Sequence, residues 1–195
     1  MSIQKRFRER NLTITKNFIF DEYGREVMGG WERDMMKKHV EILNPTGKDV
    51  LEIGFGMGIS PTFFIESNPK SYTIVECHPQ VLEKLYEWKS KYPTHNIIVI
   101  EGEWFEQKHL LGQYDCIFYD IFDDPNERDF YENVDNLLRN DGIMSFFGRV
   151  GRKTEGTFFG KEYKGELIET TRTLKDGTIK PHSYVVPIYK KSLTV

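Results

Sequence analysis

A glycine-rich turn after an apolar segment is the part of this sequence best suited to hold a ligand. The segment 50–53 is apolar except for Glu52, which suits a buried parallel strand, and Gly54, Gly56 and Gly58 follow at alternate positions. Glycines let the backbone turn tightly and let a ligand approach without a Cβ in the way. A helix that begins directly after such a turn offers free N–H groups to an anion. The pattern therefore predicts a site for a dinucleotide phosphate or for the carboxylate of an amino-acid-like cofactor.

Two carboxylates near this turn favour one of these ligands. Glu76 ends the next apolar segment, where an acidic residue takes the ribose hydroxyls of an adenosine, so it fits NAD and S-adenosylmethionine alike. Glu52 lies within the strand, where a carboxylate is unfavourable beside a pyrophosphate but can face an ammonium group directly or through water. The glycine spacing is G-x-G-x-G and not the G-x-G-x-x-G of dinucleotide sites. We therefore expect S-adenosylmethionine, with NAD and a non-catalytic fold as the less favoured alternatives.

The elements that must position these residues alternate between strands and helices. Apolar segments rich in β-branched residues and amphipathic helical segments succeed one another from residue 49 to residue 147. This order predicts a mostly parallel α/β sheet with right-handed crossovers and a reactive site at the carboxyl ends of its strands. The expected strands are 49–53, 71–76, 96–100, 114–121 and 142–147, and the expected helices are 31–43, 59–66, 79–91 and 126–139.

After Arg149 the alternation ends. Segments 166–174 and 183–189 flank a Lys-Asp-Gly-Thr turn at 175–178, which predicts a final antiparallel hairpin. Pro187 lacks a backbone N–H and therefore indicates an edge strand or a bulge. The part from Arg149 onward carries 10 Lys or Arg and 5 Asp or Glu, against 17 and 25 before it. This excess of positive charge is interpreted as a solvated hairpin, with attraction of an anionic substrate group as the sharper alternative.

Composition is that of an ordinary globular protein. The 195 residues suffice for one core, and the net charge of −3 argues against a dedicated nucleic-acid binder. No apolar run reaches the roughly 20 residues that a membrane-spanning helix needs, and no signal peptide is visible. Cys77 and Cys116 lie in apolar runs, as expected of free thiols in the cytoplasm. The five histidines lack metal-ligand spacing, so we expect no metal and interpret them as surface or packing residues.

The first 30 residues differ from the rest of the chain. They are polar and lack a clear period, but they contain scattered aromatic side chains such as Phe7 and Tyr23. A frayed terminus is one interpretation. We prefer a segment, 1–30, that packs over the active site of a domain spanning 31–195.

Four short motifs resemble those of class I S-adenosylmethionine-dependent methyltransferases. They read LEIGFGMG at 51–58, IVEC at 74–77, EGEW at 101–104 and FYDIF at 118–122. Their wording is most similar to the guanidinoacetate N-methyltransferase family and its arginine-methylating relatives, as is Val-Met…Trp-Glu at 27–32. The resemblance covers roughly residues 24–147 and, more weakly, 184–188. It implies a single Rossmann-like class I methyltransferase domain, mostly parallel, with a terminal antiparallel hairpin.

The same resemblance implies roles for individual residues. It places the cofactor along the carboxyl ends of the first four strands, with the methyl acceptor beyond its sulfonium. The implied cofactor-binding residues are Glu52, Gly54, Gly56 and Gly58 for the methionine part, Glu76 for the ribose, Gly102, Glu103 and Trp104 around the adenine, Met28 as a cover, and Asp120 below the sulfonium.

Two carboxylates suit methyl transfer to a guanidinium group, which is a poor nucleophile because its lone pairs are delocalised. Asp120 and Glu32 would clamp it bidentately, and one of them would accept the proton as the new C–N bond forms. For an amine the same pair would orient the acceptor by charge. A plain acidic loop around Asp120 and a surface position for Glu32 in the first turn of a helix are the alternatives. Tyr119 is either a core residue or part of the substrate wall.

The chain departs from the family pattern after the fifth strand. The family carries a helix there that helps to bind the substrate carboxylate, whereas 148–165 is short and glycine-rich, so the C-terminal region is shortened. Arg149 and Arg152 would replace the missing contacts to an acidic substrate. Phe105 stands where the family has an acidic residue, with Glu106 one residue later, so the adenine contact would differ.

We therefore expect an S-adenosylmethionine-dependent N-methyltransferase acting on a small molecule with a guanidino or amino group. An arginine methyltransferase acting on a protein or peptide is the alternative, and an open pocket left by the shortened region would favour it. A non-catalytic S-adenosylmethionine-binding subunit is a second alternative. The sequence predicts neither a nucleic-acid partner nor a membrane partner, and it leaves a homodimer open.

Overall fold

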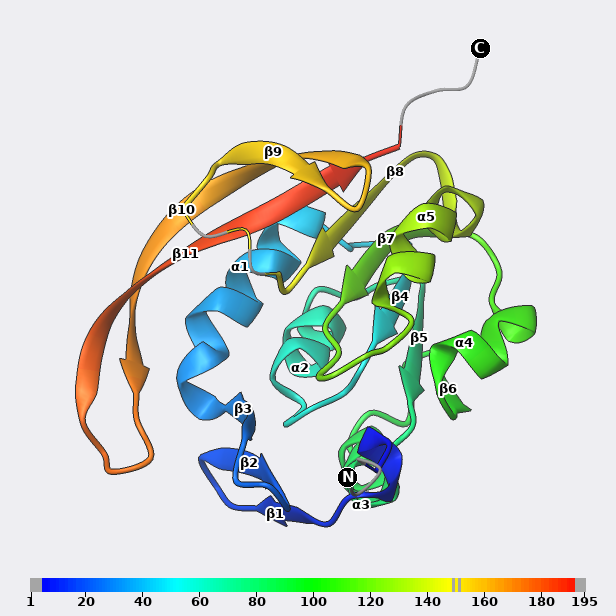
Figure 1. Ribbon diagram of the computed structural model, residues 1–195. Helices are drawn as coiled ribbons and strands as arrows, with labels where there is room; N and C mark the ends of the chain where they lie inside the picture. Colours follow the sequence, from blue (N-terminus) through cyan, green and yellow to red (C-terminus); the bar gives the residue numbers. More distant parts are fainter. Residues whose placement is uncertain (1–4, 149, 151, 192–195) are drawn as a thin grey trace.

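The computed structural model describes residues 5–148, 150 and 152–191. Their centre is an eight-stranded sheet with the strand order β6-β5-β4-β7-β8-β11-β10-β9 (Figure 1). The first five strands in this order run parallel, whereas β11 is antiparallel to both of its neighbours, so the expected fold class is confirmed. The strands are β4 (Asp49–Ile53), β5 (Ser71–Glu76), β6 (Ile97–Glu101), β7 (Tyr114–Tyr119), β8 (Leu138–Phe146), β9 (Glu155–Phe158), β10 (Lys161–Thr173) and β11 (Ile179–Lys190).

Strand β4 is buried along its whole length, which is why its sequence is almost continuously apolar. Its side chains alternate between the two faces of the sheet: Val50 packs against α1 and α2, and Leu51 packs on the side of α5. Each such fully buried side chain contributes about 1.5–3 kcal/mol to stability. One face is covered by α1 (Arg33–Leu43), α2 (Ile59–Glu66) and α3 (Pro79–Lys89), and the other by α4 (Trp104–Gln107) and α5 (Glu127–Leu137). None of the helices in the described residues is long and apolar enough to cross a membrane.

The N-terminal segment is more regular than its sequence suggests. It forms a three-stranded antiparallel sheet of β1 (Leu12–Ile14), β2 (Phe18–Asp21) and β3 (Glu26–Gly29), between the short 3-10 helices η1 (Phe7–Glu9) and η2 (Gly30–Glu32). Strands of three or four residues are too short to show a period in the sequence. The sheet is attached to α3, because the Gln80 side chain accepts a hydrogen bond from the Leu12 amide at 2.8 Å and donates one to the Leu12 carbonyl at 3.0 Å.

The C-terminal hairpin is confirmed and is longer than expected. Strands β10 and β11 pair from Lys164 opposite Ile188 to Thr173 opposite Ile179, and they curve along α1 toward the N-terminal sheet (Figure 1). Strand β11 lies between β8 and β10, but at Pro187 it pairs with β10 alone, so the expected edge position holds locally, whereas the unshifted register excludes a bulge. The proline is accommodated because the ladder to β8 involves only 188–190, and because Gly165 stands opposite it on β10. Within the described part of 147–160 the chain adds the strand β9 and no helix, in line with the shortened region.

Candidate active site

The glycine loop and the acidic end of β7 meet at the carboxyl edge of the sheet. The Gly54 amide donates to the Val75 carbonyl at 2.8 Å, and the Asp120 amide donates to the Ile53 carbonyl at 3.0 Å. Gly54 has a φ of +95°, and a Cβ at this position would lie 2.2 Å from the Asp120 carbonyl oxygen. A glycine is therefore required where β4 passes Asp120. The structure brings together two parts of the site that are 66 residues apart in the sequence.

Met28 lies directly on the glycine loop. Its Sδ accepts a hydrogen bond from the Met57 amide at 3.2 Å. Gly56 has a φ of +55°, and a Cβ there would come within 2.4 Å of the same sulfur. Because Met28 lies in β3, this contact attaches the N-terminal sheet to the loop that precedes α2.

Glu76 is held by backbone N–H groups at the end of β5. Its Oε1 accepts hydrogen bonds from the Cys77 and His78 amides, both at 2.7 Å, and its Oε2 accepts one from the Phe55 amide at 2.9 Å. Burial raises the pKa of Glu76, against the effect of these three donors. A carboxylate offers about four lone-pair positions, so Glu76 retains acceptor capacity for a ribose hydroxyl.

Glu52 points into the layer between the sheet and α2. It accepts a hydrogen bond from the Ser60 hydroxyl at 2.5 Å and another from the Tyr72 hydroxyl. Complete burial raises the pKa of Glu52 well above its ordinary value, so the neutral carboxyl is favoured. Since Ser60 lies in the first turn of α2, Glu52 fixes the helix that follows the glycine loop.

The segment after β6 lies on the opposite side of Glu76 from the loop. The Gly102 amide donates to the Glu76 carbonyl at 2.8 Å. Trp104 is buried edge-on against Phe130, and its indole N–H donates to Asp124 at 2.7 Å. Glu103 instead turns outward and pairs with Arg8 at 3.4 Å and with Arg6 at 3.5 Å.

Tyr119 belongs to the core rather than to a substrate wall. Its ring packs on Phe130 and Tyr131, and its hydroxyl donates to Asp124 at 2.5 Å. Asp124 thus accepts hydrogen bonds from both Tyr119 and Trp104. The sequence did not predict this role. An acidic residue in a loop carries no pattern that identifies its donors in advance.

Asp120 and Glu32 are near enough to act on one another electrostatically, and few hydrogen-bond donors reach them. No hydrogen bond to the Asp120 carboxylate exists among the described residues, and burial raises its pKa to about 7. Glu32 is 6% exposed, and in the part of the chain that the structure describes its carboxylate accepts one hydrogen bond, from the Gly29 amide to Oε1 at 2.8 Å. Burial first, and then the charge of Asp120, raise the pKa of Glu32 to about 8. Two carboxylates in this state favour a cation between them, because a cation restores the ionised form of both.

The hairpin meets the N-terminal segment beside Glu32. The Trp31 indole N–H donates to Glu26 at 2.8 Å, and Arg172 of β10 pairs with the same Glu26 oxygen at 3.4 Å. The Arg172 guanidinium also lies 4.8 Å from the centre of the Trp31 ring system. These contacts link residues almost 150 positions apart, and no local sequence pattern signals them. They form one wall around Glu32.

A second tie holds the loop after β7. Asp123 pairs with Arg10 at 2.7 Å and with Arg25 at 3.1 Å, so the loop that begins with Asp120 is bound to the N-terminal segment. Arg149 lies outside the described residues. Arg152 donates to the Ser183 hydroxyl at 2.9 Å and so lies along the hairpin.

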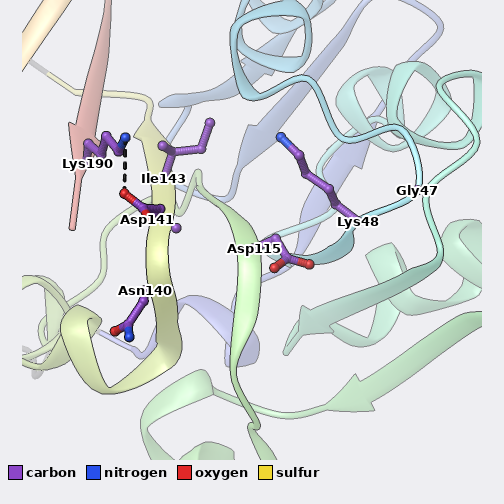
Figure 2. Close-up of a pocket in the computed structure, with 8 residues that line it drawn as sticks. Gly47, Lys48, Asp115, Asn140, Asp141, Ile143 and Lys190 are labelled. Atoms are coloured by element: carbon purple, nitrogen blue, oxygen red, sulfur yellow. Dashed lines mark ion pairs between the residues drawn. The ribbon is translucent and has the colours of Figure 1, made fainter. Parts of the chain in front are cut away.

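A separate hollow of about 480 Å³ lies at the other end of the sheet (Figure 2). Its lining comes from the beginnings of β4 and β7 and from β8, and it includes Lys48, Asp115 and the ion pair of Lys190 with Asp141 at 3.3 Å. Asp120 follows the last residue of β7, whereas Asp115 is its second residue. The hollow is therefore remote from the paired carboxylates and is not part of the candidate active site.

Comparisons with known proteins identify a matching family model and similar relatives. The family model of guanidinoacetate N-methyltransferase matches residues 13–155. Protein arginine N-methyltransferase 2 of Candida glabrata is 38% identical over 154 residues, which are 72% of this chain and 37% of that protein. Its namesake in Aspergillus fumigatus is 34% identical over 174 residues, or 84% of this chain and 41% of that protein. The chain thus spans about two fifths of the length of these relatives.

Solved structures show the same fold. The crystal structure of precorrin-6y C5,15-methyltransferase from Geobacter metallireducens superposes with a TM-score of 0.62, covering 80% of this chain and 88% of that one. The sequence identity is only 15%, so this likeness bears on the fold alone.

Proposed function

The chain belongs to the guanidinoacetate N-methyltransferase family, whose cofactor is S-adenosylmethionine, and we propose that it methylates a guanidinium nitrogen of arginine in a protein or peptide. The observation that carries the proposal is the pair formed by Glu32 and Asp120. Both carboxylates have raised pKa values and keep free acceptor positions, as a site for a cationic acceptor requires.

The residues around the glycine loop fit the cofactor. The absence of a Cβ at Gly54 and Gly56 lets Asp120 and Met28 lie directly against the loop, and Glu76 is preorganised by three amides with acceptor capacity to spare. We assign the ribose to Glu76, the methionine part to the loop 54–58, and the adenine to the segment 102–104. Glu52 would act through Ser60 by fixing the start of α2. S-adenosylmethionine supplies an electrophilic methyl group on its sulfonium.

The two carboxylates would orient the acceptor and take its proton. A guanidinium between Asp120 and Glu32 would receive two charge-assisted contacts, which restrict its rotation and turn one nitrogen toward the methyl group. As the C–N bond forms, that nitrogen becomes more acidic and one carboxylate accepts its proton. The pKa values of about 7 and 8 suit this step, because a base near the working pH both ionises and accepts a proton readily.

The N-terminal segment would cover this site. Residues 5–30 contact the glycine loop through Met28 and the loop after β7 through the pairs of Asp123 with Arg10 and Arg25. We propose that it excludes water from the cofactor and presents Glu32 to the acceptor.

An arginine within a polypeptide is favoured over a small acidic guanidine by the C-terminal region. A small acid needs a cationic partner for its carboxylate. Of the four basic residues in the described part of 148–165, Arg152 donates to the Ser183 hydroxyl and Lys161 pairs with Asp135 at 2.5 Å, whereas Lys153 and Lys164 are exposed to solvent. The names of the curated relatives support the same acceptor class.

The test is a labelled-methyl assay with a panel of acceptors. An arginine-containing peptide should be methylated, and mass spectrometry should locate the methyl group on its guanidinium. Guanidinoacetate, free arginine and a peptide with lysine in place of arginine form the comparison set. Efficient methylation of guanidinoacetate with no peptide product would overturn the proposed acceptor class, and methylated lysine would overturn the guanidinium assignment.

A further inference from the structure

A chain of buried hydrogen bonds connects the hairpin to the helix that follows Glu32. His39 on α1 is completely buried, and its Nδ1 lies 2.6 Å from the Ser145 hydroxyl of β8. Its Nε2 lies 3.1 Å from the Tyr184 hydroxyl of β11. The Ser145 hydroxyl in turn donates to the Pro187 carbonyl at 2.6 Å. His39 is thus a packing residue, as the sequence suggested, but one with both ring nitrogens engaged.

The direction of every proton in this chain follows from the carbonyl at its end. Ser145 uses its only proton on the Pro187 carbonyl, so its oxygen accepts from His39 and Nδ1 carries the proton. Burial lowers the pKa of His39 to about 3, so the ring is neutral and Nε2 is an acceptor. The Tyr184 proton therefore points to Nε2. The other acceptor near the Tyr184 hydroxyl is the Phe146 carbonyl, 3.4 Å from the phenol oxygen, and it also lies in the protein interior rather than in the site.

Tyr184 lies at the edge where the paired carboxylates are found. Its ring stacks on Phe147 at 5.2 Å with an interplanar angle of 17°, and the Phe147 amide donates to the carbonyl of Tyr119, the residue before Asp120. The Tyr184 hydroxyl is buried, its oxygen accepts from the Gly148 amide, and Asp120 and Glu32 are near enough to act on it electrostatically. His39 follows Glu32 by seven residues, two helical turns, so both emerge on one side of α1.

We propose that Tyr184 is a substrate-binding residue whose phenol oxygen accepts a hydrogen bond from the acceptor guanidinium, and that His39 is the positioning residue that keeps this oxygen a pure acceptor. The inference rests on the proposed function. The Tyr184 oxygen accepts a hydrogen bond from the Gly148 amide, and with its own proton directed inward it offers its remaining lone pair to the site. This lone pair suits an N–H group of a guanidinium and does not suit a carboxylate of the substrate. The site would then hold three oxygen acceptors, from Glu32, Asp120 and Tyr184, around one planar cation.

The experiment measures acceptor KM, kcat and cofactor Kd for Tyr184→Phe, His39→Asn, His39→Gln and the double variant of Tyr184→Phe with His39→Asn. Tyr184→Phe should raise the KM for an arginine peptide about tenfold, as loss of a hydrogen bond to a charged group does. Asn at 39 reaches only toward Ser145 and should raise KM several-fold, whereas Gln reaches toward Tyr184 and should largely restore it. In the Tyr184→Phe background, His39→Asn should add nothing further to KM.

Tyr189→Phe is the matched control, because Tyr189 is on the same strand and donates to Asp135, away from the carboxylates. It should leave acceptor KM and cofactor Kd unchanged. A second readout does not depend on turnover. Calorimetry should show that N-ethylguanidinium binds about tenfold more weakly to Tyr184→Phe than to the natural protein, in the presence of S-adenosylhomocysteine.

Three failures are distinguishable. If the natural protein methylates no arginine but Tyr184→Phe still weakens N-ethylguanidinium binding, the proposed function fails while the contact stands. If arginine is methylated and Tyr184→Phe changes neither KM nor N-ethylguanidinium affinity, the role of Tyr184 is wrong. If His39→Asn raises KM equally with and without Tyr184, His39 does not act through Tyr184.

Discussion

The acidic residues on the two sides of this site are in opposite states. On the cofactor side, Glu76 accepts three backbone N–H groups and Glu52 accepts two hydroxyls. On the acceptor side, Glu32 has one amide donor and Asp120 has none among the described residues. Glu32, Glu52 and Glu76 are buried and Asp120 is half-buried, and all four have raised pKa values. The difference lies in the number of hydrogen bonds that each carboxylate accepts from the protein.

This difference separates structural carboxylates from those reserved for a ligand. A buried charge without donors costs stability, and natural proteins keep such groups where function requires them. The cofactor-side acids shape the loop and hold it, whether or not a ligand is present. The acceptor-side acids are incomplete until a cation arrives. Substitutions on the two sides should therefore affect activity, cofactor affinity and stability differently.

The largest expected effect comes from Asp120→Asn. The substitution keeps shape and removes the charge and the base, so kcat/KM for an arginine peptide should fall about 1,000-fold, within the range for loss of a general base. S-adenosylmethionine Kd from calorimetry should change less than about threefold, because the amide of residue 120 and its bond to Ile53 remain. Asp115→Asn, on β7 but at the other end of the sheet and paired with Arg139, is the control and should retain most activity. Full activity of Asp120→Asn would contradict the assignment.

Glu76→Ala should act on the opposite side of the comparison. It leaves the amides of Phe55, Cys77 and His78 without their acceptor, which should lower the free energy of unfolding by about 2–3 kcal/mol. Cofactor Kd should rise about 100-fold, since the ribose contact and the loop shape are lost together. Urea unfolding and calorimetry measure the two effects. A variant as stable as the natural protein would mean that Glu76 does not hold the loop.

Glu32→Gln should lower activity yet raise stability in alkaline solution. The pKa of Glu32 is about 8 in the folded protein and is near 4.5 when unfolded, so the folded state binds the extra proton between these values. Stability from this group is therefore lost as pH rises from about 4.5 to 8, and a neutral glutamine avoids that loss. The variant should be about 2 kcal/mol more stable at pH 8.5 than the natural protein, with no gain at pH 4. A destabilised variant at both pH values would place Glu32 with the structural acids.

The smallest expected effect is that of Met28→Leu. Leucine keeps the apolar contact with the glycine loop but cannot accept from the Met57 amide. Cofactor Kd should rise about threefold and the free energy of unfolding should fall by less than about 1 kcal/mol, as for a weak sulfur acceptor. A change in Kd above 100-fold would mean that Met28 makes a strong direct contact with the cofactor and does not merely cover the loop.

The sequence predicted those parts of the site that follow from strand ends. Glu76 and Asp120 could be located because each ends or follows an apolar strand, and parallel strands bring their carboxyl ends together. Glu32 entered only through the family resemblance. The partners of Trp31 and His39 could not be found, because Arg172 and Tyr184 lie more than 140 residues away and are brought near only by the curvature of the hairpin. The N-terminal sheet escaped notice because its strands are so short.

The central claim is that Glu32 and Asp120 are reserved for a guanidinium, and proton release on binding tests it most directly. Near pH 7 the two groups hold protons in the free protein, and a bound cation should lower both pKa values and expel them. Calorimetry in buffers of different ionisation enthalpy, with S-adenosylhomocysteine present, should show release of about one proton per arginine peptide bound at pH 7 and close to none at pH 9.5. A peptide with citrulline in place of arginine should bind weakly and release none. Binding of the arginine peptide without proton release, or equal binding of the citrulline peptide, would contradict the account.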